Sequence, residues 1–166
     1  MGKWNWIAAA AFGAAISASG SARAEPVAVD QLHKAFAAAA KTAGIKQEIH
    51  FNSCSDADGL FRCRYSAAPA TVIEAHADAA GQPIAELAAY LPPIKRSGID
   101  ASALLTIFFR TFSPTLTPQQ AGVALKTLVN DAVGRERRGE VRLKGATYVL
   151  RPADGTAVRI YVTIDE

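Results

Sequence analysis

The sequence predicts an α+β fold, in which helices pack on one face of an antiparallel sheet. Residues 27–43 and 117–133 carry apolar side chains at helical spacing. Several other stretches alternate apolar and polar residues, which is typical of strands with one dry and one wet face. In chain order we expect a helix, three strands, a short helix, a strand, a helix and a final strand pair. That order predicts a single α+β domain.

The first 24 residues have the features of a cleaved secretory signal peptide. Lys3 supplies a basic start, and residues 7–18 form an apolar run that is too short to span a bilayer. Ala22-Arg23-Ala24 fits a cleavage site before Glu25. An uncleaved anchor helix is the alternative, disfavoured because small polar residues follow the short run. We therefore expect a periplasmic or secreted protein, with residues 25–166 as its single domain.

The charge balance excludes some classes of partner. The chain has 18 basic and 15 acidic residues, and loss of Lys3 and Arg23 with the signal peptide leaves 16 basic ones. A nearly neutral mature chain gives no electrostatic reason to expect nucleic acid or an anionic membrane as its partner. We expect neither, and the oligomeric state is not predicted.

The N-terminal half is expected to form one helix and three strands. Residues 27–43 form the helix, with Gly44 after its end. The strands are placed at 45–53, 60–66 and 71–79, each with period-two alternation. Residues 55–59, "SDADG", are expected to form a five-residue hairpin loop between the first two strands.

The middle of the chain is less regular. Residues 81–93 are expected to hold a short helix, because Pro83 suits a first turn and Pro92-Pro93 ends it. Residues 101–112, "ASALLTIFFRTF", fit both a helical stripe and a buried strand. Their aromatic and β-branched content favours the strand, with Arg110 exposed at its end.

The C-terminal part begins with the clearest helix. Thr117, Pro118 and Gln120 provide an N-cap, an N1 proline and a capping box, and Gly134 ends the helix. Two or three strands are expected to follow. Their segments are 141–143, 146–152 and, after a turn at 153–155, the alternating residues 158–164.

The two cysteines, Cys54 and Cys63, are predicted to form a disulfide. An exported chain meets an oxidising compartment, and the spacing fits neither a C-x-x-C redox motif nor a four-ligand zinc site. The five-residue loop pairs Cys54 with Leu60, which puts the two sulfurs on opposite faces. The bond therefore predicts a bulge or an irregular loop near 53–55.

Glu74, His76 and Asp78 are the low-probability candidates for catalysis. On a strand these three side chains project from one face about 7 Å apart. An imidazole between two acids can move a proton or bind a metal. That spacing is too wide for three residues of one strand to chelate an ion. Cross-strand ion pairs with Arg62 and Arg64 are the favoured interpretation.

A cluster of cations is the low-probability candidate for an anion patch. Its members are Arg135, Arg137, Arg138, Arg142 and Lys144, with Glu136 and Glu140 among them. The favoured interpretation is a helix C-terminus complemented by cations, followed by the solvent face of a strand.

No motif identifies an enzyme or a cofactor. G-x-S-x-G, H-E-x-x-H, the Walker loop and the dinucleotide fingerprint are missing from the sequence, and Asp56-x-Asp58-Gly59 lacks the later ligands of a calcium loop. We expect no cofactor and no metal. The favoured function is a small exported binding or accessory protein whose ligand is a peptide, a protein or an envelope component. The alternatives are a hydrolase or metal-dependent enzyme that uses Glu74, His76 and Asp78, and a structural protein that assembles through a sheet edge.

Overall fold

The computed structural model describes residues 26–68, 70–92, 101–134, 137–153 and 157–165. The predicted signal peptide and its cleavage site lie outside these residues, and so does most of the predicted turn at 153–155. None of the described helices is long and apolar enough to cross a membrane.

The described residues form an α+β structure with one seven-stranded antiparallel sheet, as predicted. The strands lie in the order β1-β2-β3-β4-β7-β6-β5. The helical elements are η1 (Val29–Gln31), α1 (Leu32–Thr42), α3 (Ala101–Phe112) and α4 (Pro118–Val133). The strands are β1 (His50–Ala57), β2 (Leu60–Ala68), β3 (Thr71–Ala77), β4 (Glu86–Leu91), β5 (Gly139–Leu143), β6 (Ala146–Pro152) and β7 (Val158–Ile164).

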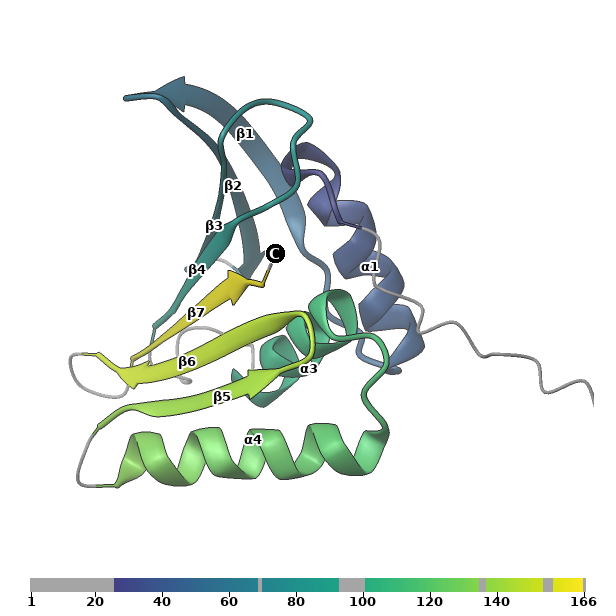
Figure 1. The fold of residues 1–166 in the computed structure, drawn as a ribbon, viewed down its shortest axis with the longest axis vertical. Coiled ribbons are helices and arrows are strands. Elements are labelled where there is room, and N and C mark those ends of the chain that lie inside the picture. The colour runs from purple at the N-terminus through teal and green to yellow at the C-terminus, as the bar shows by residue number, and fades with distance from the viewer. Residues whose placement is uncertain (1–25, 69, 93–100, 135–136, 154–156, 166) are drawn as a thin grey trace, which may run out of the picture.

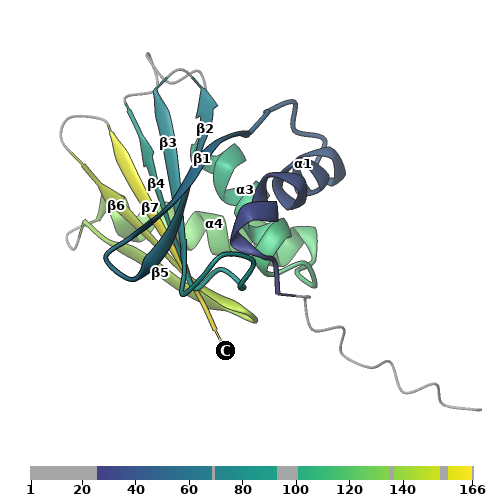
Figure 2. The ribbon, with the colours of Figure 1, turned by 90° about the horizontal axis from the view of Figure 1, so that it is seen from above.

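All three α-helices lie on one side of the sheet, which twists strongly between its two edges (Figure 1). Seen from above, the strands form one layer and α1, α3 and α4 form the other (Figure 2). We call the sheet face toward the helices the inner face and the opposite one the outer face. The inner face is dry: Ile73, Leu87, Tyr148, Ile160 and Val162 are all fully buried.

The helices predicted at 27–43 and 117–133 are present as α1 and α4, and both end where their capping residues indicate. Helix α1 begins after a single 3-10 turn, and Gly44 follows its end with a positive φ of 68°. Thr117 accepts a hydrogen bond from the Gln120 N–H, and the Gln120 side chain accepts one from the Thr117 N–H. This capping box satisfies two N–H groups that the first turn of α4 leaves unpaired.

The prediction of a strand at residues 101–112 is wrong, because this segment is helix α3. Phe108 packs against the rings of Phe36 and Phe112, with centroid distances of 5.4 and 6.3 Å. A helix enclosed by other elements buries residues all round, so its composition resembles that of a buried strand. The hydroxyl groups of Thr106 and Thr111 donate to carbonyls four residues earlier, which satisfies both inside the helix. Arg110 lies at the helix end, half-buried, and donates to the Leu116 carbonyl.

The prediction of a short helix at residues 81–93 is also wrong, because Glu86–Leu91 form strand β4. Leu87, Ala89 and Leu91 are buried on the inner face. Ala88 and Tyr90, which alternate with them, lie on the outer face and are also not charged. The alternation is therefore weak in the sequence, and pairing with β3 and β7 decides the structure.

The hairpin between β1 and β2 is tighter than predicted. Only Asp58 and Gly59 form its turn, both at positive φ (57° and 77°), which is typical of a two-residue Asp-Gly turn. Strand β1 continues to Ala57 through polar residues, because it is an edge strand and almost entirely exposed. The predicted five-residue loop and the Cys54–Leu60 pairing are therefore wrong.

The shorter turn pairs Cys54 directly with Cys63 and puts both on the inner face. Their sulfur atoms lie at bonding distance, with the two Cα atoms 4.1 Å apart, so the predicted disulfide is confirmed. Cys63 is fully buried, and Cys54 is the one half-buried residue of β1. The hairpin is irregular as expected, but its register shift lies between Phe51 and Ser53, just before the predicted place.

Two buried tyrosines make the fold sensitive to alkali. Burial, and secondarily the Asp30 carboxylate, hold the pKa of Tyr65 well above its ordinary value. Burial and Asp165 raise the pKa of Tyr148, although its hydrogen bond with Ser113 acts in the opposite direction. Both groups keep their protons in the folded chain at pH values where an unfolded chain loses them, near pH 10.

We expect the free energy of unfolding to be unaffected by these groups below about pH 9 and to fall above about pH 10. The unfolded state binds fewer protons there, so each tyrosine removes on the order of 1 kcal/mol per pH unit. Urea unfolding at pH 8, 10 and 11 measures this slope. Tyr65→Phe and Tyr148→Phe should each reduce it, and a stability that is constant up to pH 11 would contradict the burial of both hydroxyls.

Candidate functional site

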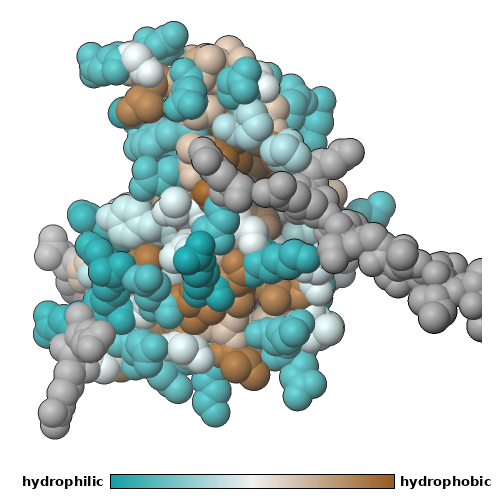
Figure 3. Space-filling model, in the orientation of Figure 1, coloured by the Kyte–Doolittle hydropathy of each residue, from teal (hydrophilic) through white to brown (hydrophobic). Residues whose placement is uncertain are grey.

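The outer face of the sheet carries the candidate site, because the described helices leave this face uncovered (Figure 2). Hydrophilic residues dominate the side of the molecule in Figure 3, with smaller hydrophobic areas at the level of β5 and β6. Hydrophobic residues also reach the surface at the centre of the outer face: Tyr90 is 42% exposed and Val72 is 38% exposed. Both lie on neighbouring strands and are paired in register.

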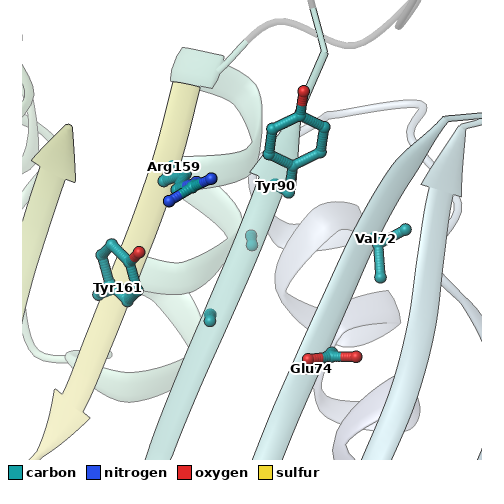
Figure 4. Close-up of a pocket in the computed structure, with 7 residues that line it drawn as sticks. Val72, Glu74, Tyr90, Arg159 and Tyr161 are labelled. Atoms are coloured by element: carbon teal, nitrogen blue, oxygen red, sulfur yellow. The ribbon is translucent and has the colours of Figure 1, made fainter. Parts of the chain in front are cut away.

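These residues line a shallow hollow of about 170 Å³, which we call the outer-face hollow. Figure 4 looks onto it, with side chains from three adjacent strands around the small residues of β4. The lining includes Val72 and Glu74 from β3, Ala88 and Tyr90 from β4, and Arg159 and Tyr161 from β7. Ala88 is the floor that makes the hollow, since its cross-strand neighbours Glu74 and Tyr161 are both larger.

The hollow has a basic end and an acidic end. Arg159 reaches from β7 toward β4 (Figure 4), and Arg151 lies directly opposite it on β6. The guanidinium carbon of Arg151 is 5.8 Å from the ring centroid of Tyr161, within the range of a cation–π contact. Glu74 lies on the other side of the hollow, where Arg64 on β2 donates to one of its carboxylate oxygens at 2.7 and 3.2 Å.

Glu74, His76 and Asp78 lie close together in sequence but have different surroundings in the fold. Glu74 makes the cross-strand ion pair with Arg64 that was expected for this face. His76 is half-buried and lies opposite Arg62 of β2 and Glu86 of β4 in the strand register. Its Nε2 atom has no hydrogen-bond partner in the described residues. Asp78 is exposed and follows the last residue of β3. Over the described ranges, no three His, Cys, Asp or Glu side chains are grouped so as to hold a metal ion.

The described members of the predicted cation cluster lie between α4 and β5, on β5 and directly after it. Arg135 lies outside the described residues. Arg138 forms an ion pair with Glu140, and Arg142 lies 3.5 Å from the Asp165 carboxylate. Arg137 and Lys144 are exposed. Two of the five cations therefore already have a carboxylate partner.

The outer-face hollow was not predicted from the sequence. The alternation of β7 places Arg159 and Tyr161 on the wet face, so an aromatic residue among polar positions was the available signal. Tyr90 gives no such signal, because the sequence predicts a helix for its segment, residues 81–93.

Comparison with known proteins adds no identification. No protein-family model, no curated protein and no solved structure matches this chain.

Proposed function

We propose that this protein is a small exported binding protein that takes its ligand on the outer face of the sheet. The observation that carries the proposal is the outer-face hollow, where two tyrosines, a valine and an arginine without a carboxylate partner among the described residues surround a small concavity. Exposed aromatic and arginine side chains around a concave centre are the composition typical of binding surfaces.

The composition of the hollow favours binding over catalysis. Among the described residues that line it, Glu74 is the one carboxylate, and it forms an ion pair with Arg64. Its other polar side chains are Arg159, Tyr90 and Tyr161, none of which pairs with a base in the described part of the chain. A nucleophile activated by a neighbouring base is the arrangement that hydrolysis requires, so the hydrolase alternative stays a prediction without support from this geometry.

Two observations support export. The leader sequence has the features of a signal peptide. The Cys54–Cys63 pair lies at disulfide distance, and stable disulfides belong to oxidising compartments.

Amide chemical-shift mapping tests the proposed function. The full chain is titrated with acidic, neutral and basic peptides, peptidoglycan fragments and anionic phospholipid vesicles. We expect at least one of these probes to shift the amides of Val72, Ala88, Tyr90 and Tyr161. Shifts confined to α1, α3 and α4, or turnover of a probe without shifts on the outer face, would contradict the proposal.

Strand β1 favours assembly through a sheet edge as a second candidate. It is an edge strand of eight residues, and Phe51 on it is 45% exposed. Exposed edges can pair with the edge of another chain, although bulges and charges such as those of β1 oppose this. Sedimentation of the full chain decides the matter: a dimer that Phe51→Lys dissociates supports edge assembly, and a monomer at high concentration excludes it.

A further inference from the structure

Arg151 and Arg159 form an unusual pair on the outer face. They lie directly opposite each other on β6 and β7. Side chains in such positions stand about 5 Å apart at Cβ, and like charges there are destabilising. The Arg151 contact with Tyr161 accounts for one of them. Arg159 has neither a carboxylate nor a ring as partner in the described ranges, and it lines the hollow.

Other arginines on the outer face have a carboxylate partner of the kind that the described residues do not provide for Arg151 and Arg159. Arg64 is held by Glu74 at 2.7 Å, and Arg142 lies 3.5 Å from Asp165. Arg62 lies on β2, opposite His76 and away from the hollow. Glu74 of β3 and Asp165, just after β7, are therefore the carboxylate partners of two outer-face arginines, while the described residues supply none to the pair beside the hollow.

The size of the hollow limits what can enter it. The hollow is open to solvent, and its volume of about 170 Å³ leaves room for a small group beside the side chains that line it. One aromatic ring fits, with Tyr90 and Tyr161 beside it for stacked or edge contacts. Glu74 on the far side disfavours an anion there, so an anionic group is favoured only at the arginine end.

We propose that Arg151 and Arg159 bind a carboxylate of an acidic peptide segment, and that a neighbouring aromatic side chain of that segment enters the outer-face hollow. This inference rests on the proposed function and names the ligand of the same surface. Arginine suits this role, because its planar guanidinium donates two parallel hydrogen bonds to one carboxylate. Arg159 belongs to the arginine pair and also lines the hollow, so neighbouring residues of one peptide can reach both.

Calorimetric titration of the full chain tests the inference. The probe is a seven-residue peptide with one phenylalanine between two aspartates. The matched peptides carry asparagine in place of the aspartates, or alanine in place of the phenylalanine. We expect the acidic aromatic peptide to bind at least tenfold more tightly than either, and to weaken with added salt because the contact is ionic.

Matched variants locate the contact. Arg159→Gln and Arg151→Gln should each weaken binding of the acidic aromatic peptide at least tenfold. Lys126→Gln removes one charge from the exposed side of α4 and should change the affinity less than twofold. Arg159→Lys keeps the positive charge but loses the two parallel hydrogen-bond donors of the guanidinium. Its affinity for the peptide should therefore lie between the affinities of Arg159→Gln and Lys126→Gln. Unchanged urea unfolding midpoints confirm that each variant is folded.

Two further variants separate the possible failures. Ala88→Trp fills the hollow and should abolish binding of the aromatic peptides. If it abolishes binding while Arg159→Gln has no effect, the surface binds ligands but the carboxylate inference is wrong. If phosphatidylglycerol vesicles bind and the peptides do not, the peptide inference is wrong as well. Asp154 lies outside the described residues, so Asp154→Asn is included: a tenfold gain in affinity would mean that the chain itself occupies the arginines, which overturns the inference.

Discussion

Replacing Phe108 by alanine is expected to lower the free energy of unfolding by about 3–5 kcal/mol. Phe108 is fully buried and contacts Phe36 of α1 and Phe112 of its own helix. Alanine removes the apolar surface and leaves a cavity that the surrounding helices and sheet cannot fill. Urea unfolding followed by circular dichroism measures the change.

The control for this variant is Val123→Ala on α4. Val123 is 63% exposed, so the same kind of truncation should change the stability by less than about 0.5 kcal/mol. A loss of under 1 kcal/mol for Phe108→Ala would contradict the position of α3 in the helix layer, packed against α1 and the sheet. That position decides which sheet face is covered, and with it the location of the candidate site.

The double variant Cys54→Ala/Cys63→Ala is expected to lose about 2.7 kcal/mol, the chain-entropy value for a closed ring of about ten residues. The disulfide joins the edge strand β1 to β2 next to a two-residue turn. Removing the disulfide raises the conformational entropy of the unfolded chain but not that of the folded hairpin, so the free energy of unfolding falls. Alanine is used because Cys63 is fully buried, and serine would leave a hydroxyl without a partner.

Reduction of the unaltered chain with dithiothreitol is the companion measurement. It should produce a similar loss and should not change the double variant further. Equal stability of the oxidised and reduced chains would mean that the disulfide does not constrain the native hairpin. If loss of the disulfide mainly destabilises β1, the amide hydrogens of residues 50–57 should exchange faster, because this edge strand has few contacts besides those with β2.

The parts of the fold that were predicted correctly are those with local signals. Thr117, Gln120 and Gly134 mark the ends of α4 through capping chemistry, which acts within one turn. The alternation of β2, β3 and β7 is clear because their outer residues are charged or polar at most positions. Such signals depend on a few neighbouring residues, so a single sequence contains them.

The errors occur where tertiary packing decides. Residues 101–112 are helical because α1, α4 and the sheet enclose them, and no local feature separates such a helix from a buried strand. The hairpin register depended on the turn length: Asp58-Gly59 was within the predicted loop, but the polar residues of β1 looked like loop residues. An exposed edge strand has no dry face to reveal it.

The candidate site was missed for a related reason. Strand β4 lacks charged residues at Ala88 and Tyr90, which hides its period-two pattern. These same two residues form the floor and one wall of the outer-face hollow. Predictions of secondary structure from local sequence are expected to fail most often at functional positions, because the residues there serve ligand binding more than the fold.

Chemical nitration of the four tyrosines is the measurement that most directly tests the central claim, a bare sheet face that binds ligand. Tyr90 and Tyr161 lie on the outer face, whereas Tyr65 and Tyr148 are fully buried beneath the helices. With tetranitromethane and mass spectrometry, we predict that Tyr90 is modified first, that Tyr65 and Tyr148 are spared until the chain unfolds, and that the acidic aromatic peptide slows the reaction at Tyr90. Nitration of Tyr148 as fast as Tyr90 in the native chain, or a Tyr90 rate that no ligand changes, would contradict it.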